Sequence, residues 1–164
     1  MQGTKDSFYI ALRDRLVQRD PKRTITIDGA TRPAIVVAED EPPYAIPNQN
    51  DAFYLEWGGI RAVHPSNSTL CAIDCAISYS SAGSEDSSGV DRGSDLGSLD
   101  ADLLAICWPP RTHKYDYRSG DQPEDQGSSI FWSHPELKPL KSATTQVGHQ
   151  ALITIFFYPE VNQA

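Results

Sequence analysis

The three cysteines, Cys71, Cys75 and Cys107, are the first candidates for metal binding or nucleophilic chemistry. Cys71 and Cys75 lie in a segment whose apolar and polar residues alternate as they do in a strand. On a strand, a spacing of four separates the two thiols by about 13 Å, at roughly 3.3 Å per residue. A zinc ion holds its sulfur ligands at about 2.3 Å, so it cannot bind both. We expect three reduced thiols that pack as small hydrophobic groups, with no metal site.

The histidines form no recognisable catalytic pattern. They fall in predicted loops or at strand ends, and H-E-x-x-H, G-x-S-x-G and C-x-x-C are absent from the sequence. A nucleophile pair of Cys107 and His113 is conceivable, but the spacing does not support it. We therefore expect surface histidines at His64, His113, His134 and His149.

The many carboxylates also fail to suggest a site. A hydrolase that uses carboxylates needs two of them to converge in a cleft, whereas these fall in predicted loops and on helix faces. Asp91-Arg-Gly-Ser-Asp95 does not fit a calcium-binding loop, and Gly89-Val-Asp-Arg-Gly-Ser94 lacks the lysine of a phosphate-binding loop. The sequence thus predicts a protein that is not an enzyme and has no cofactor.

Composition narrows the possible partners further. The formal net charge of −8 and the isoelectric point near 4.8 disfavour binding to nucleic acid or to anionic membranes. The first sixteen residues, MQGTKDSFYIALRDRL, lack the apolar core of a signal peptide, and no apolar run reaches 18 residues. We expect a protein made in the cytosol.

The elements that would position these residues can be read from periodicity. A length of 164 residues predicts a single domain over 1–164. Apolar spacings of three and four predict two helices, at 6–19 with a cap at Asp6 or Ser7, and at 90–107. Predicted strands are 24–27, 32–37, 52–57, 61–64, 69–79, 129–132 and 150–158. Long loops are expected at 39–51, 80–89, 109–128 and 134–149.

This order predicts an α+β fold: a mainly antiparallel or mixed β-sheet with two α-helices packed on one face. Asp28-Gly29 should form the tight turn of a hairpin, and the apolar segment 150–158 should lie in mid-sheet. Several aromatic residues fall in predicted loops or strand ends, and Tyr and Trp beside Arg are favoured at interfaces. The candidate interface residues are Tyr115, Asp116, Tyr117, Arg118 and Trp132, with the acidic residues Glu39, Asp40 and Glu41.

The last third of the chain resembles a known family. Tyr115-Asp-Tyr-Arg118 is followed by an acidic spacer, by Ile130-Phe-Trp-Ser133 and by an apolar strand that ends in Phe157-Tyr-Pro-Glu160. These segments resemble the lambda-type minor tail protein U family, the tail terminators of long-tailed phages. The order of upstream elements is similar too, although the 39–51 loop and a 134–149 insertion are longer than in the family.

The resemblance implies a structural protein of the virion tail or neck, made in the host cytoplasm. Tail terminators form a hexameric ring at the head-proximal end of the tail tube, stop its polymerisation and join tail to head. Implied partners are further copies of the chain, a tail tube protein, a neck or head-completion protein, and DNA that passes through the lumen without specific binding. No cofactor and no membrane contact is implied.

Three other functions fit the residues. One is another ring protein of a phage neck, or the cap of a contractile injection system. The second is a small hydrolase that gathers His113 or His134 with two carboxylates. The third is an adaptor that binds a peptide at a sheet edge.

Overall fold

The computed structural model describes residues 1–41, 50–63, 69–84, 86–118, 120–140 and 147–159. Its helices are α1 (Gln2–Arg19) and α2 (Arg92–Ile106), with a short 3-10 helix η1 (Ala38–Asp40). Its strands are β1 (Thr24–Ile27), β2 (Ala30–Pro33), β3 (Ile35–Val37), β4 (Phe53–Ala62), β5 (Cys71–Ser81), β6 (Arg111–Asp116), β7 (Glu124–Trp132), β8 (Glu136–Leu140) and β9 (Val147–Phe157).

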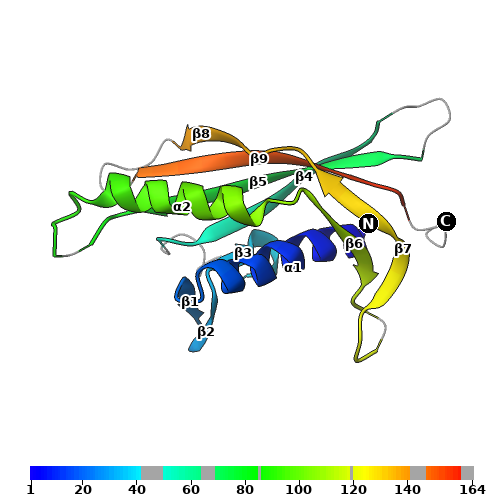
Figure 1. Ribbon diagram of the computed structural model, residues 1–164, viewed down its shortest axis with the longest axis horizontal. Coiled ribbons are helices and arrows are strands. Elements are labelled where there is room, and N and C mark those ends of the chain that lie inside the picture. Colours follow the sequence, from blue (N-terminus) through cyan, green and yellow to red (C-terminus); the bar gives the residue numbers. More distant parts are fainter. Residues whose placement is uncertain (42–49, 64–68, 85, 119, 141–146, 160–164) are drawn as a thin grey trace.

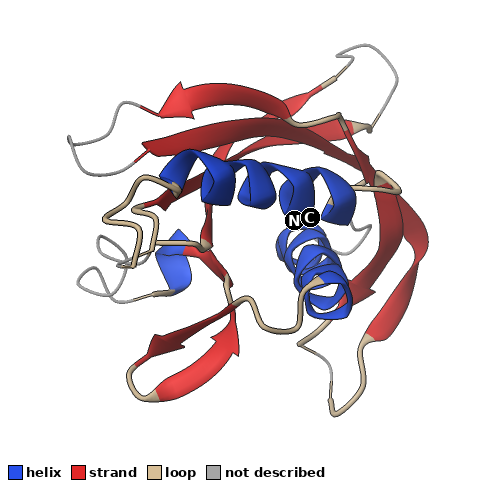
Figure 2. Cartoon of the chain, turned by 60° about the vertical axis from the view of Figure 1, so that its left-hand side comes forward, coloured by secondary structure: helices blue, strands red, loops and turns tan. Residues whose placement is uncertain are grey.

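Seven strands form one sheet in the order β3-β4-β5-β9-β7-β6, and β8 pairs with β9 beside β7. All neighbouring strands are antiparallel except β3 and β4, which are parallel. Both helices lie on one side of this sheet (Figures 1 and 2). The predicted α+β fold is therefore confirmed. β1 and β2 form a separate hairpin.

Strands β5 and β9 are the centre of the sheet. They pair over eleven residues, from Cys71 with Phe157 to Ser81 with Val147. Alternate residues of both strands are buried under the helices, as the alternation of 69–79 predicted. From α1, Phe8, Leu12 and Leu16 join this core, and from α2, Leu96, Leu99, Leu103 and Ile106. Burying each of these large apolar side chains contributes about 1.5 to 3 kcal/mol.

A second, smaller cluster covers part of the opposite face. Ile25 and Ile27 of the β1–β2 hairpin pack with Val36 of β3, and Tyr54 of β4 adds to the cluster. The turn of this hairpin is Asp28-Gly29, as predicted, and both residues have positive φ angles of 49° and 79°. The predicted strand 32–37 is divided, because Pro33 ends β2 and Ile35 begins a strand of the large sheet.

Helix α1 begins four residues earlier than predicted. Its N-cap is Met1, so the predicted cap at Asp6 or Ser7 is wrong. Ser7 is instead buried inside the helix, where its hydroxyl accepts a 2.9 Å hydrogen bond from the amide N–H of Tyr115 in β6. Arg15, two turns further along, donates to the carbonyl oxygens of Ile106, Pro109 and Arg111. Helix α1 thereby covers the outer edge of β6.

Several predicted strand and loop boundaries are also wrong. The predicted strands 52–57 and 61–64 are one strand, β4, because Gly58-Gly59 forms a bulge instead of a break. The predicted loop 109–128 contains β6 and the first half of β7. The predicted loop 134–149 contains β8 and the start of β9. Ser80 and Ser81 end β5 rather than opening a loop.

Candidate interaction surfaces

The predicted interface segment 115–118 lies where β6 ends, beside α1. Tyr115 and Tyr117 line a hollow of about 510 Å³ with Ile10, Arg13 and Asp14 of α1 and with Pro123. The two tyrosine rings meet edge to face, with centroids 6.0 Å apart. Burial raises the pKa of Tyr117 above its usual value. We call this hollow the tyrosine groove.

Asp116 and Arg118 are engaged with each other. The backbone N–H of Arg118 donates to the Asp116 carboxylate at 2.9 Å, and the guanidinium donates to it as well. These bonds lower the pKa of Asp116. The pair shapes the turn that presents Tyr117, and the tyrosines provide the apolar area of the groove.

Trp132 does not lie on the surface, so the prediction that it forms an interface is wrong. Its side chain is only 4% exposed. The indole N–H donates to the Cys107 carbonyl at 2.9 Å, and the ring meets Phe8 edge to face with centroids 5.0 Å apart. A buried tryptophan needs such a hydrogen-bond partner, and the α2–β6 connection supplies it.

The acidic segment lies on the other side of the same helix. Glu39 forms an ion pair with Lys5 of α1 at 3.4 Å, and Glu41 pairs with Arg32. Burial raises the pKa of Asp40, and the neighbouring Glu39 and Asp6 charges raise it further. Since Lys5 contacts Glu39 while Ser7 contacts Tyr115, segments 39–41 and 115–118 flank the first half of α1. Two of the predicted segments thus lie against the same helix.

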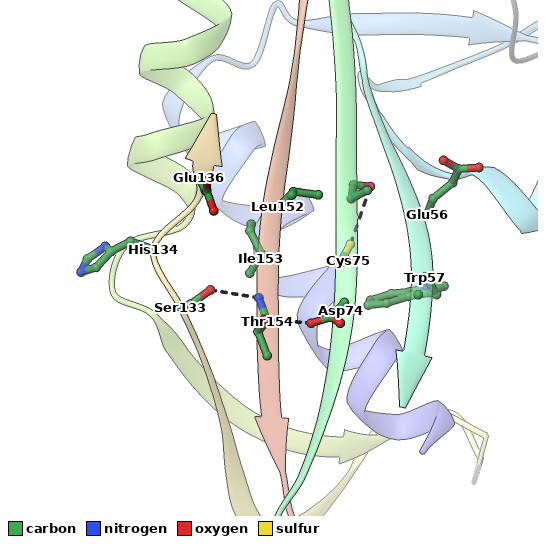
Figure 3. Close-up of a pocket in the computed structure, with 12 residues that line it drawn as sticks. Glu56, Trp57, Asp74, Cys75, Ser133, His134, Glu136, Leu152, Ile153 and Thr154 are labelled. Atoms are coloured by element: carbon green, nitrogen blue, oxygen red, sulfur yellow. Dashed lines mark hydrogen bonds between the residues drawn. The ribbon is translucent and has the colours of Figure 1, made fainter. Parts of the chain in front are cut away.

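A second surface lies on the face of the sheet opposite the helices, which we call the helix-free face. It carries a hollow of about 770 Å³ whose lining includes Asp74, Leu152 and Thr154 (Figure 3). The Thr154 hydroxyl donates to Asp74 at 2.8 Å, and Arg61 contacts the same carboxylate at 2.6 Å. The hydrogen bond from Arg61 lowers the pKa of Asp74.

Next to this hollow, two phenylalanines stack on the same face. The rings of Phe131 and Phe156 are 5.3 Å apart and inclined by 17°, and Phe131 is 43% exposed. Sequence reasoning missed this surface because residues 129–132 and 150–158 read as apolar strands with no exposed side. The small residues Ala72 and Ala76 on the alternate positions of β5 were a usable signal, since they leave that face shallow.

The candidate chemical groups are placed as follows. Cys75 and Cys107 are buried, Cys71 is half-buried, and the structure describes all three as free thiols. Burial raises the pKa of both buried thiols, to about 12 for Cys107. Among the described residues, no three His, Cys, Asp or Glu side chains gather as a metal site would need.

The histidines differ from one another. His113 is exposed and 3.8 Å from Asp125, and His134 stacks on Trp108. His149 contradicts the prediction of a surface histidine, because it lies within β9, half-buried, with its Nδ1 2.8 Å from Asp100. Asp100 also accepts the Tyr79 hydroxyl, so this cluster ties α2 to the sheet. His64 lies outside the described residues.

The comparisons with known proteins leave the family open. No protein-family model matches the chain, and no curated protein matches it. Within the described part of the chain, no helix has the length and apolarity needed to cross a membrane.

Proposed function

We propose that this chain is a structural subunit that assembles into a ring and acts as a phage tail terminator. The observation that carries the proposal is the tyrosine groove, flanked across α1 by the acidic segment 39–41. A groove that contains two half-buried tyrosines and an arginine has the composition of an interface centre. It differs in place and chemistry from the helix-free face.

Ring closure needs a contact between two different patches on neighbouring subunits. The groove supplies a concave patch of this kind. The edge of β6 beside the groove cannot pair with a further strand. Ser7 and Arg15 of α1 already form hydrogen bonds with backbone groups of Tyr115 and Arg111 in that strand. A neighbouring subunit would therefore contact side chains at this place. Side-chain contacts define one relative orientation of the subunits, whereas pairing between strand edges can slip in register.

The proposed role implies binding partners on both sides of the ring. The ring would sit on a tail tube protein and bind a neck or head-completion protein on its other side. The formal charge of −8 suits a lumen through which DNA passes without being held, since acidic groups do not bind phosphates. The role needs no catalytic residue and no cofactor.

The experiment that tests this proposal is a mass measurement followed by a capping assay. Light scattering after size exclusion should give six times the subunit mass of 18.1 kDa. Added to a polymerising tail tube protein, the ring should shorten the tubes. Tyr117→Ser should weaken ring formation about tenfold or more, as the loss of an interface anchor does.

Trp108→Ala is the matched control, because this aromatic side chain is 62% exposed but lies outside the groove. It should leave the ring unchanged. A chain that stays monomeric up to high concentration and leaves tube length unaltered would refute the proposal.

A further inference from the structure

The tyrosine groove has the composition of a site that binds a proline-rich segment. Tyr115 and Tyr117 meet edge to face at 6.0 Å, and Ile10 and Pro123 add further apolar surface. Neither tyrosine hydroxyl forms a hydrogen bond with another described residue, so both can donate one to a ligand. A segment in the polyproline II conformation has no internal hydrogen bonds and offers free carbonyl oxygens. Aromatic-lined grooves are a recurrent binding site for such segments.

The length and charge of the groove suit a short, uncharged ligand. Its α1 wall runs from Ile10 to Asp14, which is about 6 Å at 1.5 Å per residue. Two residues in polyproline II cover the same length, at about 3.1 Å each. The charged residues of the lining, Arg13 and Asp14, are paired with each other at 2.9 Å. The groove is thus close to neutral, and an uncharged segment can enter it without leaving a charge unpaired.

A segment of this kind follows η1 directly in the sequence. Residues 42–50 read Pro-Pro-Tyr-Ala-Ile-Pro-Asn-Gln-Asn and carry no charge, although the whole chain has a net charge of −8. Residues 42–49 lie outside the described part of the chain. Proline fixes its own φ at about −65° and favours an extended conformation in the residue before it. The Pro42-Pro43 pair therefore loses little conformational freedom when it binds.

The described residues on either side of this segment hold its ends away from the groove of the same chain. Glu41 pairs with Arg32, and the Ser80 hydroxyl donates to Asn50 at 3.2 Å. Figure 2 shows η1 and the β6–β7 hairpin on opposite sides of α1. Within one chain, α1 therefore lies between η1 and the groove. The groove of a neighbouring chain has no such obstacle in front of it.

We propose that the segment from Pro42 to Pro47 binds in the tyrosine groove of a second copy of this chain. The inference rests on the proposed function and names the contact that closes the ring. Since the segment and the groove lie on different sides of a subunit, the contact is head to tail. Each subunit gives its segment to one neighbour and receives a segment from the other. Contacts of this kind continue around a ring, whereas a two-fold contact ends at a dimer.

The segment is tested first within the assembly. Replacing both prolines, Pro42→Ser and Pro43→Ser, should weaken assembly about tenfold or more, because the segment loses two apolar groups and its restricted backbone. Light scattering over a dilution series measures this change. Pro139→Ser is the control, since this exposed proline lies in β8 and outside the groove, and it should leave assembly unchanged. A ring that is equally stable without Pro42 and Pro43 overturns this inference and leaves the proposed function intact.

A peptide tests the groove directly. A fluorescent peptide of residues 39–48 should bind the full-length variant that carries Pro42→Ser and Pro43→Ser, because its grooves have lost their own ligand. Fluorescence anisotropy follows the titration. Adding Tyr117→Ser to this variant should weaken peptide binding about tenfold or more. A peptide of the same composition with its prolines separated should bind more weakly by a similar factor, because it lacks the proline pair.

The remaining outcomes separate the two proposals. A peptide that does not bind up to about 1 mM, or that binds equally well after Tyr117→Ser, overturns the docking. Equal affinity for a peptide of ten prolines, which lacks Tyr44 and Ile46, assigns the groove to a foreign proline-rich partner and overturns the second copy as its ligand. If the chain assembles through this segment but does not shorten tail tubes, the docking holds and the proposed function fails.

Discussion

At the scale of single residues, burial divides the three cysteines into two groups. Cys75 is 1% and Cys107 2% exposed, while Cys71 is half-buried at the start of β5. Burial raises the pKa of the Cys107 thiol to about 12 and also raises that of Cys75, so neither forms much thiolate near neutral pH. The thiolate is the form that reacts with electrophiles.

We therefore expect one fast-reacting thiol per folded chain. At pH 8, a disulfide reagent such as dithionitrobenzoate should label Cys71 first. The other two should react only on unfolding, when all three are labelled. Cys71→Ser should remove the fast phase. Rapid labelling of all three thiols in the folded protein would contradict the burial described.

A second residue-scale prediction concerns Asp91, which precedes α2. Its carboxylate accepts hydrogen bonds from the backbone and hydroxyl of Ser84 and from the hydroxyl of Ser87. These bonds lower its pKa from 3.8 to about 2. Because the folded pKa is the lower one, the stabilisation is complete above the unfolded value and disappears as the pH falls through about 2.

A carbon-detected NMR titration of the Asp91 carboxyl should thus show a midpoint near 2. Ser84→Ala should raise this midpoint, since it removes the donated hydroxyl. If the midpoint stays the same in that variant, the Ser84 hydroxyl does not hold the carboxylate.

At the scale of elements, an ion-pair cluster joins α1 to α2. Asp102 of α2 accepts from the Nε atoms of Arg19 at 2.7 Å and of Arg23 at 2.9 Å, and its side chain is 10% exposed. Removing the carboxylate leaves two arginines close together with no shared anion. Because Arg19 remains 45% exposed to water, the cost stays below that of a fully buried pair.

Asp102→Ala should lower the free energy of unfolding by about 2 kcal/mol. Urea denaturation measures this change. Asp121→Ala is the charge-matched control, because this carboxylate is exposed, and it should change stability by less than about 0.5 kcal/mol. Equal effects of the two substitutions would mean that net charge, and not the cluster, matters.

The same scale shows what periodicity could and could not predict. The strand at 69–79 and the helix at 90–107 were predicted because one side of each is continuously apolar. Strands β6 and β8 and the first half of β7 were missed, because their exposed positions carry charged or small residues such as Glu124, Gly127 and Lys138. These segments are strands because they pair with neighbouring strands, and the local sequence gives little indication of that pairing.

At the scale of the whole molecule, the candidate surfaces combine residues that are distant in sequence. Segments 39–41 and 115–118 could be named from composition, but their placement on either side of α1 depends on how the chain folds back. Trp132 was misassigned for the same reason, because an aromatic residue at the end of a strand can be core or surface. The helix-free face was not predicted, since its residues come together only once the register of the strands is set.

The contacts of α1 with β6 and β7 also set an order of events during synthesis. Phe8 packs on Trp132, and Ser7 bonds to Tyr115, so the first helix made has partners more than 100 residues downstream. At about 5 to 20 residues per second, its apolar side waits for at least several seconds on the ribosome before those partners appear. We infer that a fragment that ends after α2 would lack the contacts of this helix with Tyr115 and Trp132. The first helix would then reach its full set of contacts only after the last third has emerged.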